Sequence, residues 1–126
     1  MKRKPIRQVS DLEVYCLSFS SALEIFELSK KFPKEELYGI TSQIRRAAAS
    51  ITANISEGCG RKTKADFARF LTMALGSTNE VEYFLLLSKD LEYLDIDKYD
   101  LLTRQLVEIR KMLLSLENKI SSESNL

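Results

Sequence analysis

Residues 38–64, YGITSQIRRAAASITANISEGCGRKTK, decide the fold of this chain. Apolar residues recur every three or four positions here, so they share one face of an α-helix. The opposite face carries mostly small residues, which would let another helix come close. Gly58, Cys59 and Gly60 are expected to end the helix, because glycine tolerates a left-handed cap conformation. The apolar face consists of Leu37, Ile40, Ile44, Ala47, Ala48, Ile51 and Ile55.

Three other segments have the same helical period, and no segment has the alternation typical of a strand. Long helices joined by short turns predict an all-α, antiparallel up-down-up-down four-helix bundle. Residues 1–10 are expected to form a flexible basic arm, and residues 121–126 a frayed tail. The expected helices, within a bundle spanning 11–120, cover about residues 11–32, 36–57, 64–93 and 97–120.

The helix ends are predicted from capping residues. Ser10 or Asp11 can cap the first helix, and Asp97 the fourth. Thr63 with Asp66 three residues later resembles a capping box, so the third helix should begin there. The inward face of the first helix is expected to contain Leu12, Tyr15, Phe19, Ala22, Leu23 and Phe26.

The composition restricts the function classes. With 126 residues and a net charge of +1, the chain has the length of one domain and no overall charge that attracts nucleic acid. It contains no histidine, the commonest general base and transition-metal ligand. Two cysteines, no signal peptide and no apolar run of ~18 residues indicate a cytoplasmic, soluble protein without membrane contact.

Catalysis has little support in this sequence. Di-iron sites in helical bundles use Glu-x-x-His pairs, which are missing here. Cys16 and Cys59 have no histidine to activate them, and GCGRKTK at 58–64 lacks the spacing of a phosphate-binding P-loop. We therefore expect no catalytic residue, no cofactor and no metal, and a protein that is not an enzyme.

Basic residues are concentrated between positions 45 and 69. Four of them are expected at one end of the bundle, beside the N–H groups that begin the third helix, where a phosphate could bind. The alternative is that Arg61, Lys62 and Lys64 are ordinary solvated charges. Arg45 and Arg46 could instead pair between subunits with the acidic stretch 80–100. The candidate nucleic-acid ligands are Arg45, Arg46, Arg61, Lys62, Lys64 and Arg69.

Four consecutive apolar residues, FLLL at 84–87, cover the whole circumference of a helix. One bundle core cannot bury them all, which indicates a subunit interface. The alternative is a locally wide core with one leucine exposed. The expected oligomer interface contains Ser42, Ala49, Ala53, Phe84, Leu86 and Leu87.

Three strings, YGITSQIRRAAASI at 38–51, NISEG at 54–58 followed by Arg61, and DFARFLTMALGSTNEVEY at 66–83, resemble one bacterial family. Its members are four-helix bundles first named for proteins encoded within intervening sequences of 23S rRNA genes. The resemblance covers about residues 11–120. It implies a homopentameric barrel, and kinship with the accessory protein of diversity-generating retroelements, which binds nucleic acid and a reverse transcriptase.

Two functions follow as expectations. The first is a non-enzymatic homo-oligomer, pentameric, that binds RNA or other nucleic acid through its basic surface. The alternative is a protein-binding assembly scaffold without nucleic-acid binding. A protein partner such as a polymerase fits either one.

Overall fold

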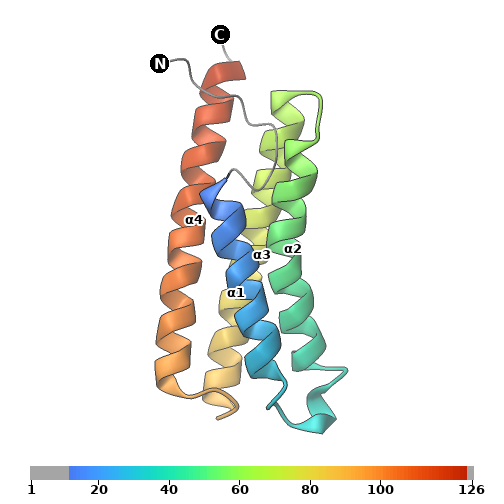
Figure 1. The fold of residues 1–126 in the computed structure, drawn as a ribbon, viewed down its shortest axis with the longest axis vertical. Helices are drawn as coiled ribbons and strands as arrows, with labels where there is room; N and C mark the ends of the chain where they lie inside the picture. The colour runs from blue at the N-terminus through green and yellow to red at the C-terminus, as the bar shows by residue number, and fades with distance from the viewer. Residues whose placement is uncertain (1–11, 125–126) are drawn as a thin grey trace.

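Four long helices pack side by side in the computed structural model, which describes residues 12–124 (Figure 1). They are α1 (Glu13–Ser29), α2 (Ile40–Cys59), α3 (Lys64–Asp90) and α4 (Ile96–Ser124), with a short 3₁₀ turn, η2 (Lys34–Glu36), after α1. Consecutive helices run in opposite directions (Figure 1), and no strand occurs within the described residues. The all-α four-helix bundle predicted from the sequence is confirmed.

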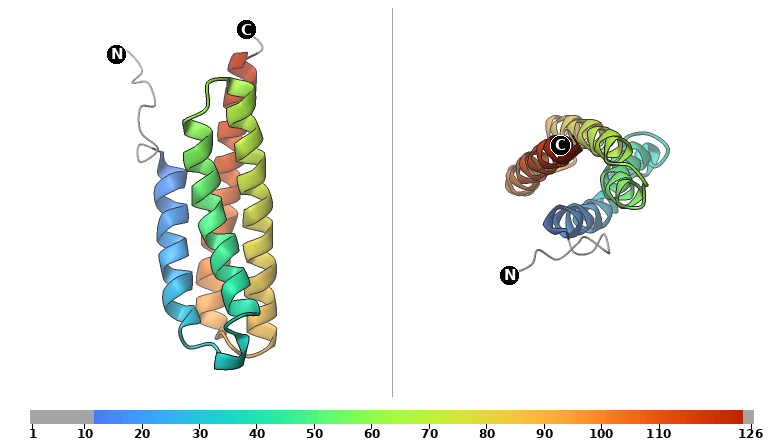
Figure 2. Two further views of the ribbon diagram at one scale, coloured as in Figure 1. Left: turned by 90° about the vertical axis from the view of Figure 1, so that its right-hand side faces the viewer. Right: turned by 90° about the horizontal axis from the view of Figure 1, so that it is seen from above.

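The helices are arranged around the bundle in chain order (Figure 2). Each packs against its neighbour in the sequence, and α1 also contacts α4. The α2–α3 turn lies at one end of the bundle, while η2 and the α3–α4 turn lie at the other (Figure 1). No helix within residues 12–124 is both long enough and apolar enough to cross a membrane.

The core is mainly aliphatic. The predicted stripe of α2 is buried from Ile40 to Ile55, whereas Leu37 lies in the turn before the helix and is exposed. Apolar residues recur along α4 at a regular three-four spacing, which keeps one helix face toward the neighbouring helices. Its fully buried residues are Leu102, Leu106, Ile109 and Leu113.

The predicted inward face of α1 is only partly right. Ala22 is buried, and Leu12 and Tyr15 are half-buried against the core. Phe19, Leu23 and Phe26 are instead 46%, 60% and 41% exposed. Small hydroxyl side chains take the inward positions because they let neighbouring helices approach and can bond to them. The buried residues of α1 are Val14, Ser18, Ser21, Ala22, Ile25 and Ser29.

Two contacts explain why serine is tolerated there. Ser21 Oγ donates to Gln105 Oε1 of α4 at 2.7 Å. Thr52 Oγ1 of α2 donates to Ser18 Oγ at 2.9 Å. Each bond supplies a partner for a hydroxyl group that burial would otherwise penalise.

The capping predictions have mixed outcomes. Thr63 caps α3 as predicted, because its Oγ1 accepts the Asp66 N–H at 3.1 Å. For α4, Asp95 takes the place predicted for Asp97, since its Oδ1 accepts the Lys98 N–H at 2.9 Å. Asp97 lies within the first turn. The caps predicted at residues 10 and 11 and the basic arm 1–10 lie outside the described residues.

The end of α2 differs from the prediction in its physical cause. Gly60 has φ −88° and ψ 0°, so no left-handed cap is formed there. Gly58 is needed instead for close packing. A Cβ atom on it would lie 2.9 Å from Phe67 Cδ1 and 3.0 Å from Phe70 Cβ.

Several other boundaries shift. Helix α2 begins at Ile40 rather than near 36, because η2 occupies 34–36. Helix α3 ends at Asp90 rather than 93, and Glu92 turns the chain with a positive φ of 65°. Helix α4 continues to Ser124, so positions 121–124 are helical rather than a frayed tail.

Candidate functional site

Arg61 and Arg69, at the α2–α3 turn, converge on one carboxylate. Arg69 Nε lies 3.0 Å from Asp66 Oδ1, and Arg61 Nε lies 3.5 Å from Asp66 Oδ2. The guanidinium carbon of each arginine also lies 4.6 Å from the ring centroid of Phe70. Arg61 is additionally 3.8 Å from a Glu57 oxygen. The two guanidinium groups are therefore held in place by the chain itself.

Lys62 and Lys64 are exposed on the same turn. The Lys62 side chain has no ion pair within residues 12–124. We call Arg61, Lys62, Lys64 and Arg69 together the basic end. Because Asp66 already stands beside the two arginines in the first turn of α3, a phosphate group arriving there must compete with this carboxylate.

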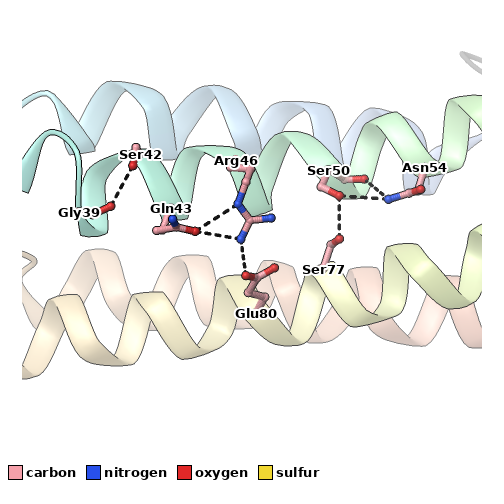
Figure 3. A network of polar contacts seen from close by, with 8 residues as sticks. All are labelled: Gly39, Ser42, Gln43, Arg46, Ser50, Asn54, Ser77 and Glu80. Atoms are coloured by element: carbon pink, nitrogen blue, oxygen red, sulfur yellow. Dashed lines mark hydrogen bonds and ion pairs between the residues drawn. The ribbon is translucent and has the colours of Figure 1, made fainter.

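Arg45 and Arg46 lie apart from the basic end. Arg45 Nε donates to Ser29 Oγ at 2.8 Å, and its guanidinium carbon is 5.2 Å from the Phe26 ring centroid. Arg46 forms an ion pair with Glu80 of α3 in the same chain (Figure 3). Its predicted acidic partner is thus reached without a second subunit, and the six predicted cations do not form one surface.

A row of polar contacts joins α2 to α3 beside this ion pair (Figure 3). Ser50 Oγ and Ser77 Oγ lie 2.8 Å apart, and Asn54 Nδ2 donates to Ser50 Oγ at 3.1 Å. At the start of α2, Ser42 Oγ donates to the Gly39 carbonyl at 3.0 Å. The contacts between α2 and α3 fix their antiparallel register, since rising residue numbers on one helix meet falling numbers on the other.

An apolar groove, of which the sequence reasoning identified only the α2 wall, runs along the surface between α1 and α2. It has a volume of about 360 Å³ and an almost entirely apolar lining. The α1 wall carries the exposed aromatic and leucine side chains, and the α2 wall carries small ones. The spacing of seven residues between Phe19 and Phe26 could have indicated the α1 wall, but the same spacing also fits two residues of the core. We call this feature the α1–α2 groove; it is lined by Tyr15, Phe19, Ala22, Leu23, Phe26, Ala49, Thr52, Ala53 and Ser56.

The predicted interface residues fall into two groups. Ser42, Ala49 and Ala53 are exposed on α2, and both alanines line the α1–α2 groove. The run 84–87 divides: Leu85 is fully buried and Leu86 is exposed. The other two, Phe84 and Leu87, are half-buried and pack against the core.

The two cysteines differ in environment. Cys16 is exposed on α1, and Cys59 is half-buried at the end of α2. Burial raises the pKa of the Cys59 thiol, which keeps it protonated and weakly nucleophilic at neutral pH. Within residues 12–124, no three His, Cys, Asp or Glu side chains gather in a way that could hold a metal ion.

Comparison with known proteins identifies the family. Residues 10–115 match the family model of the 23S rRNA-intervening sequence proteins. A crystal structure of a protein of unknown function from the S23 ribosomal protein family of Bacteroides thetaiotaomicron is similar, with 33% sequence identity and a TM-score of 0.77. The match covers 82% of this chain and 97% of that one. No curated protein matches significantly. Since the family model spans most of the sequence, the chain belongs to the 23S rRNA-intervening sequence protein family.

Proposed function

We propose that the protein is a non-enzymatic homopentamer that binds RNA or another nucleic acid through the basic end of each subunit. The observation that carries the proposal is the gathering of Arg61, Lys62, Lys64 and Arg69 at one end of the bundle, two of them stacked on Phe70. The family name and the resemblance to a nucleic-acid-binding accessory protein agree with it.

The physical basis is the release of counterions from the phosphate backbone when lysine and arginine neutralise it. A single basic end offers few contacts. In a ring, however, five basic ends would lie on the same side and act together on one strand. The ordered guanidinium groups of Arg61 and Arg69 would also lose less side-chain entropy on binding a phosphate.

A salt-dependent titration tests this function. Binding of a structured RNA would be followed by fluorescence anisotropy at roughly 50 and 200 mM salt. The triple variant Arg61→Gln, Lys62→Gln, Lys64→Gln should bind at least ~10-fold more weakly and with a flatter dependence on salt. The matched control removes three lysines at the opposite end of the bundle: Lys30→Gln, Lys34→Gln and Lys98→Gln.

The control should bind as the parent protein does. Equal losses in the two triple variants would mean that only net charge matters. Affinity of the parent no better than millimolar at low salt, or independent of salt, would also contradict nucleic-acid binding.

The second candidate is an assembly scaffold that binds proteins and no nucleic acid. The exposed apolar lining of the α1–α2 groove favours it, because such patches mark protein contacts. Co-purification from cells separates the two functions. A scaffold keeps its protein partners in the basic-end triple variant and binds no RNA, whereas the proposed function requires RNA to be lost from that variant.

A further inference from the structure

Gly76 lies near the middle of α3 on the exposed side, and no contact within residues 12–124 requires a glycine there. A Cβ atom at this position would have no heavy-atom neighbour within 4 Å beyond its own helix backbone, and its φ is not positive. Glycine inside a helix is less stable than alanine. Gly58, by contrast, is required by Phe67 and Phe70. Gly76 is therefore best explained by the close approach of something outside the chain.

Exposed apolar side chains lie before and after Gly76 along α3. Met73 lies one turn before it, and Tyr83 and Leu86 lie two to three turns after it. At 100° per residue they occupy the same outer side of the helix. We call Met73, Gly76, Tyr83 and Leu86 the α3 ridge. Asn79 and Glu80 also lie on this side of the helix, so the α3 ridge combines exposed apolar side chains with polar ones, as interfaces between subunits do.

We propose that the α3 ridge of one copy docks into the α1–α2 groove of a second copy, with both bundles in the same up-down orientation. This inference rests on the proposed homo-oligomer and specifies how it is built. The small side chains of Ala49 and Ala53 in the groove would allow the backbone at Gly76 to come close. Because groove and ridge are different faces, the contact is head-to-tail, and its repetition can close a ring.

The register inside one bundle shows which residues of the two faces share a level. Ser50 contacts Ser77, and Arg46 contacts Glu80, so Ala49 and Gly76 lie at nearly the same height. Near the α2–α3 turn, Gly58 lies against Phe67 and Phe70, which places Glu57 near the level of Arg69.

Charge order favours the parallel orientation. Along α2, Glu57 lies beyond one end of the groove and Arg45 at the other. Along α3, Arg69 lies at the level of Glu57 and Glu80 at the level of Arg45. At 1.5 Å per residue, the two charged residues are about 18 Å apart along α2 and about 17 Å apart along α3. Parallel copies bring Glu57 toward Arg69 and Arg45 toward Glu80, in addition to the ion pairs that Arg69 and Glu80 already form with Asp66 and Arg46 of their own chain. Antiparallel copies would oppose like charges at both ends, which is unfavourable.

Disulfide trapping tests the inference in a Cys16→Ser, Cys59→Ser background. Chains carrying Ala49→Cys would be co-expressed with differently tagged chains carrying Gly76→Cys. Mild oxidation should link the two kinds of chain to each other, and neither kind to itself, because the contact is head-to-tail. A second pair, Ala53→Cys with Met73→Cys, lies one helical turn nearer the α2–α3 turn and avoids replacing the glycine. Leu114→Cys, exposed on α4, is the control and should not link to Ala49→Cys.

The outcomes separate the interface from the assembly. If the background protein sediments as an oligomer and neither groove–ridge pair links, the interface is wrong while the proposed homo-oligomer stands. If Ala49→Cys links to itself, or as readily to Leu114→Cys, the head-to-tail contact with α3 is also overturned. If the background protein sediments as a single chain, the proposed homo-oligomer fails.

Discussion

The basic end and the α1–α2 groove differ in how far the chain satisfies their side chains. At the basic end, Arg61 and Arg69 already have a carboxylate, Asp66, and share an aromatic ring. In the groove, Phe19 and Leu23 remain largely exposed. The sequence made the charges look like the functional feature. Within residues 12–124, the apolar surface is the one that lacks partners.

This difference follows from solvation. An exposed charge is stable in water, and an exposed ion pair contributes only about 0–1 kcal/mol, so a cluster of charges needs no outside partner. Burying a leucine or phenylalanine side chain fully contributes roughly 1.5–3 kcal/mol. Several of them left on one surface therefore argue more strongly for a partner than several lysines do.

The largest expected effect comes from placing a charge in the groove. Leu23→Glu should disperse the proposed oligomer, because an unpaired carboxylate would be buried among apolar side chains at a cost of roughly 3–5 kcal/mol. That cost corresponds to at least ~100-fold weaker self-association. Sedimentation velocity measures it. The monomer should stay folded, since Leu23 is exposed within the chain.

Leu114→Glu is the matched control, because Leu114 is a similarly exposed leucine on α4. It should leave the proposed oligomer intact. If Leu23→Glu assembles like the parent protein, the groove is not an interface. Dispersal by both variants would remove the distinction between the groove and the rest of the surface.

The second-largest effect is expected from a change at Gly58, which packs against the Phe67 and Phe70 side chains beside the basic end. Gly58→Ala should destabilise the fold by about 1–3 kcal/mol, because its Cβ would overlap Phe67 and crowd Phe70. Thermal unfolding followed by circular dichroism measures the loss. Gly60→Ala is the matched control and should change stability little, because a Cβ there would meet only Glu57 O at 3.6 Å. Unchanged stability in Gly58→Ala would show that the two rings move aside without cost.

Local patterns predicted the parts of the fold that depend on local interactions. The stripe of α2 and the cap at Thr63 each involve residues within a few turns of one helix, so spacing was enough. The pair of Asp66 and Arg69 is equally local, three residues apart on α3, although it was not predicted. By contrast, the partnership of Arg46 with Glu80 depends on the register between two helices, which no local pattern encodes.

The face of α1 was misassigned for a different reason. Periodicity identifies an apolar stripe but does not say whether the core or another surface covers it. Ser18 and Ser21 form part of the buried face and look polar in sequence, while Phe19 and Phe26 look like core residues and lie in the groove. The α1 residues of the groove were thus recognised as an apolar stripe, but the prediction placed them inside the bundle.

A smaller effect should sharpen the comparison at the basic end. Asp66→Asn removes the carboxylate that Arg61 and Arg69 share, so both should become available to phosphate. Because these pairs are partly exposed, the gain in nucleic-acid affinity should be at most about 1 kcal/mol, roughly fivefold. Anisotropy titration measures it against Glu108→Gln, which removes an exposed carboxylate from α4. Equal gains in both variants would mean that Asp66 has no specific hold on the arginines.

The smallest effect concerns Gly76, and it can be measured only in a variant that does not self-associate. In the Leu23→Glu background, Gly76→Ala should raise the free energy of unfolding by about 0.5–1 kcal/mol, because a Cβ there contacts none of the described residues and alanine favours the helix. In the parent protein the same change should weaken self-association, because the added methyl group would separate the two backbones. Urea unfolding and sedimentation measure the two effects. A glycine whose replacement strengthens the single chain but weakens the assembly is explained by the neighbouring copy; if Gly76→Ala leaves the assembly unaffected, the glycine has no such role.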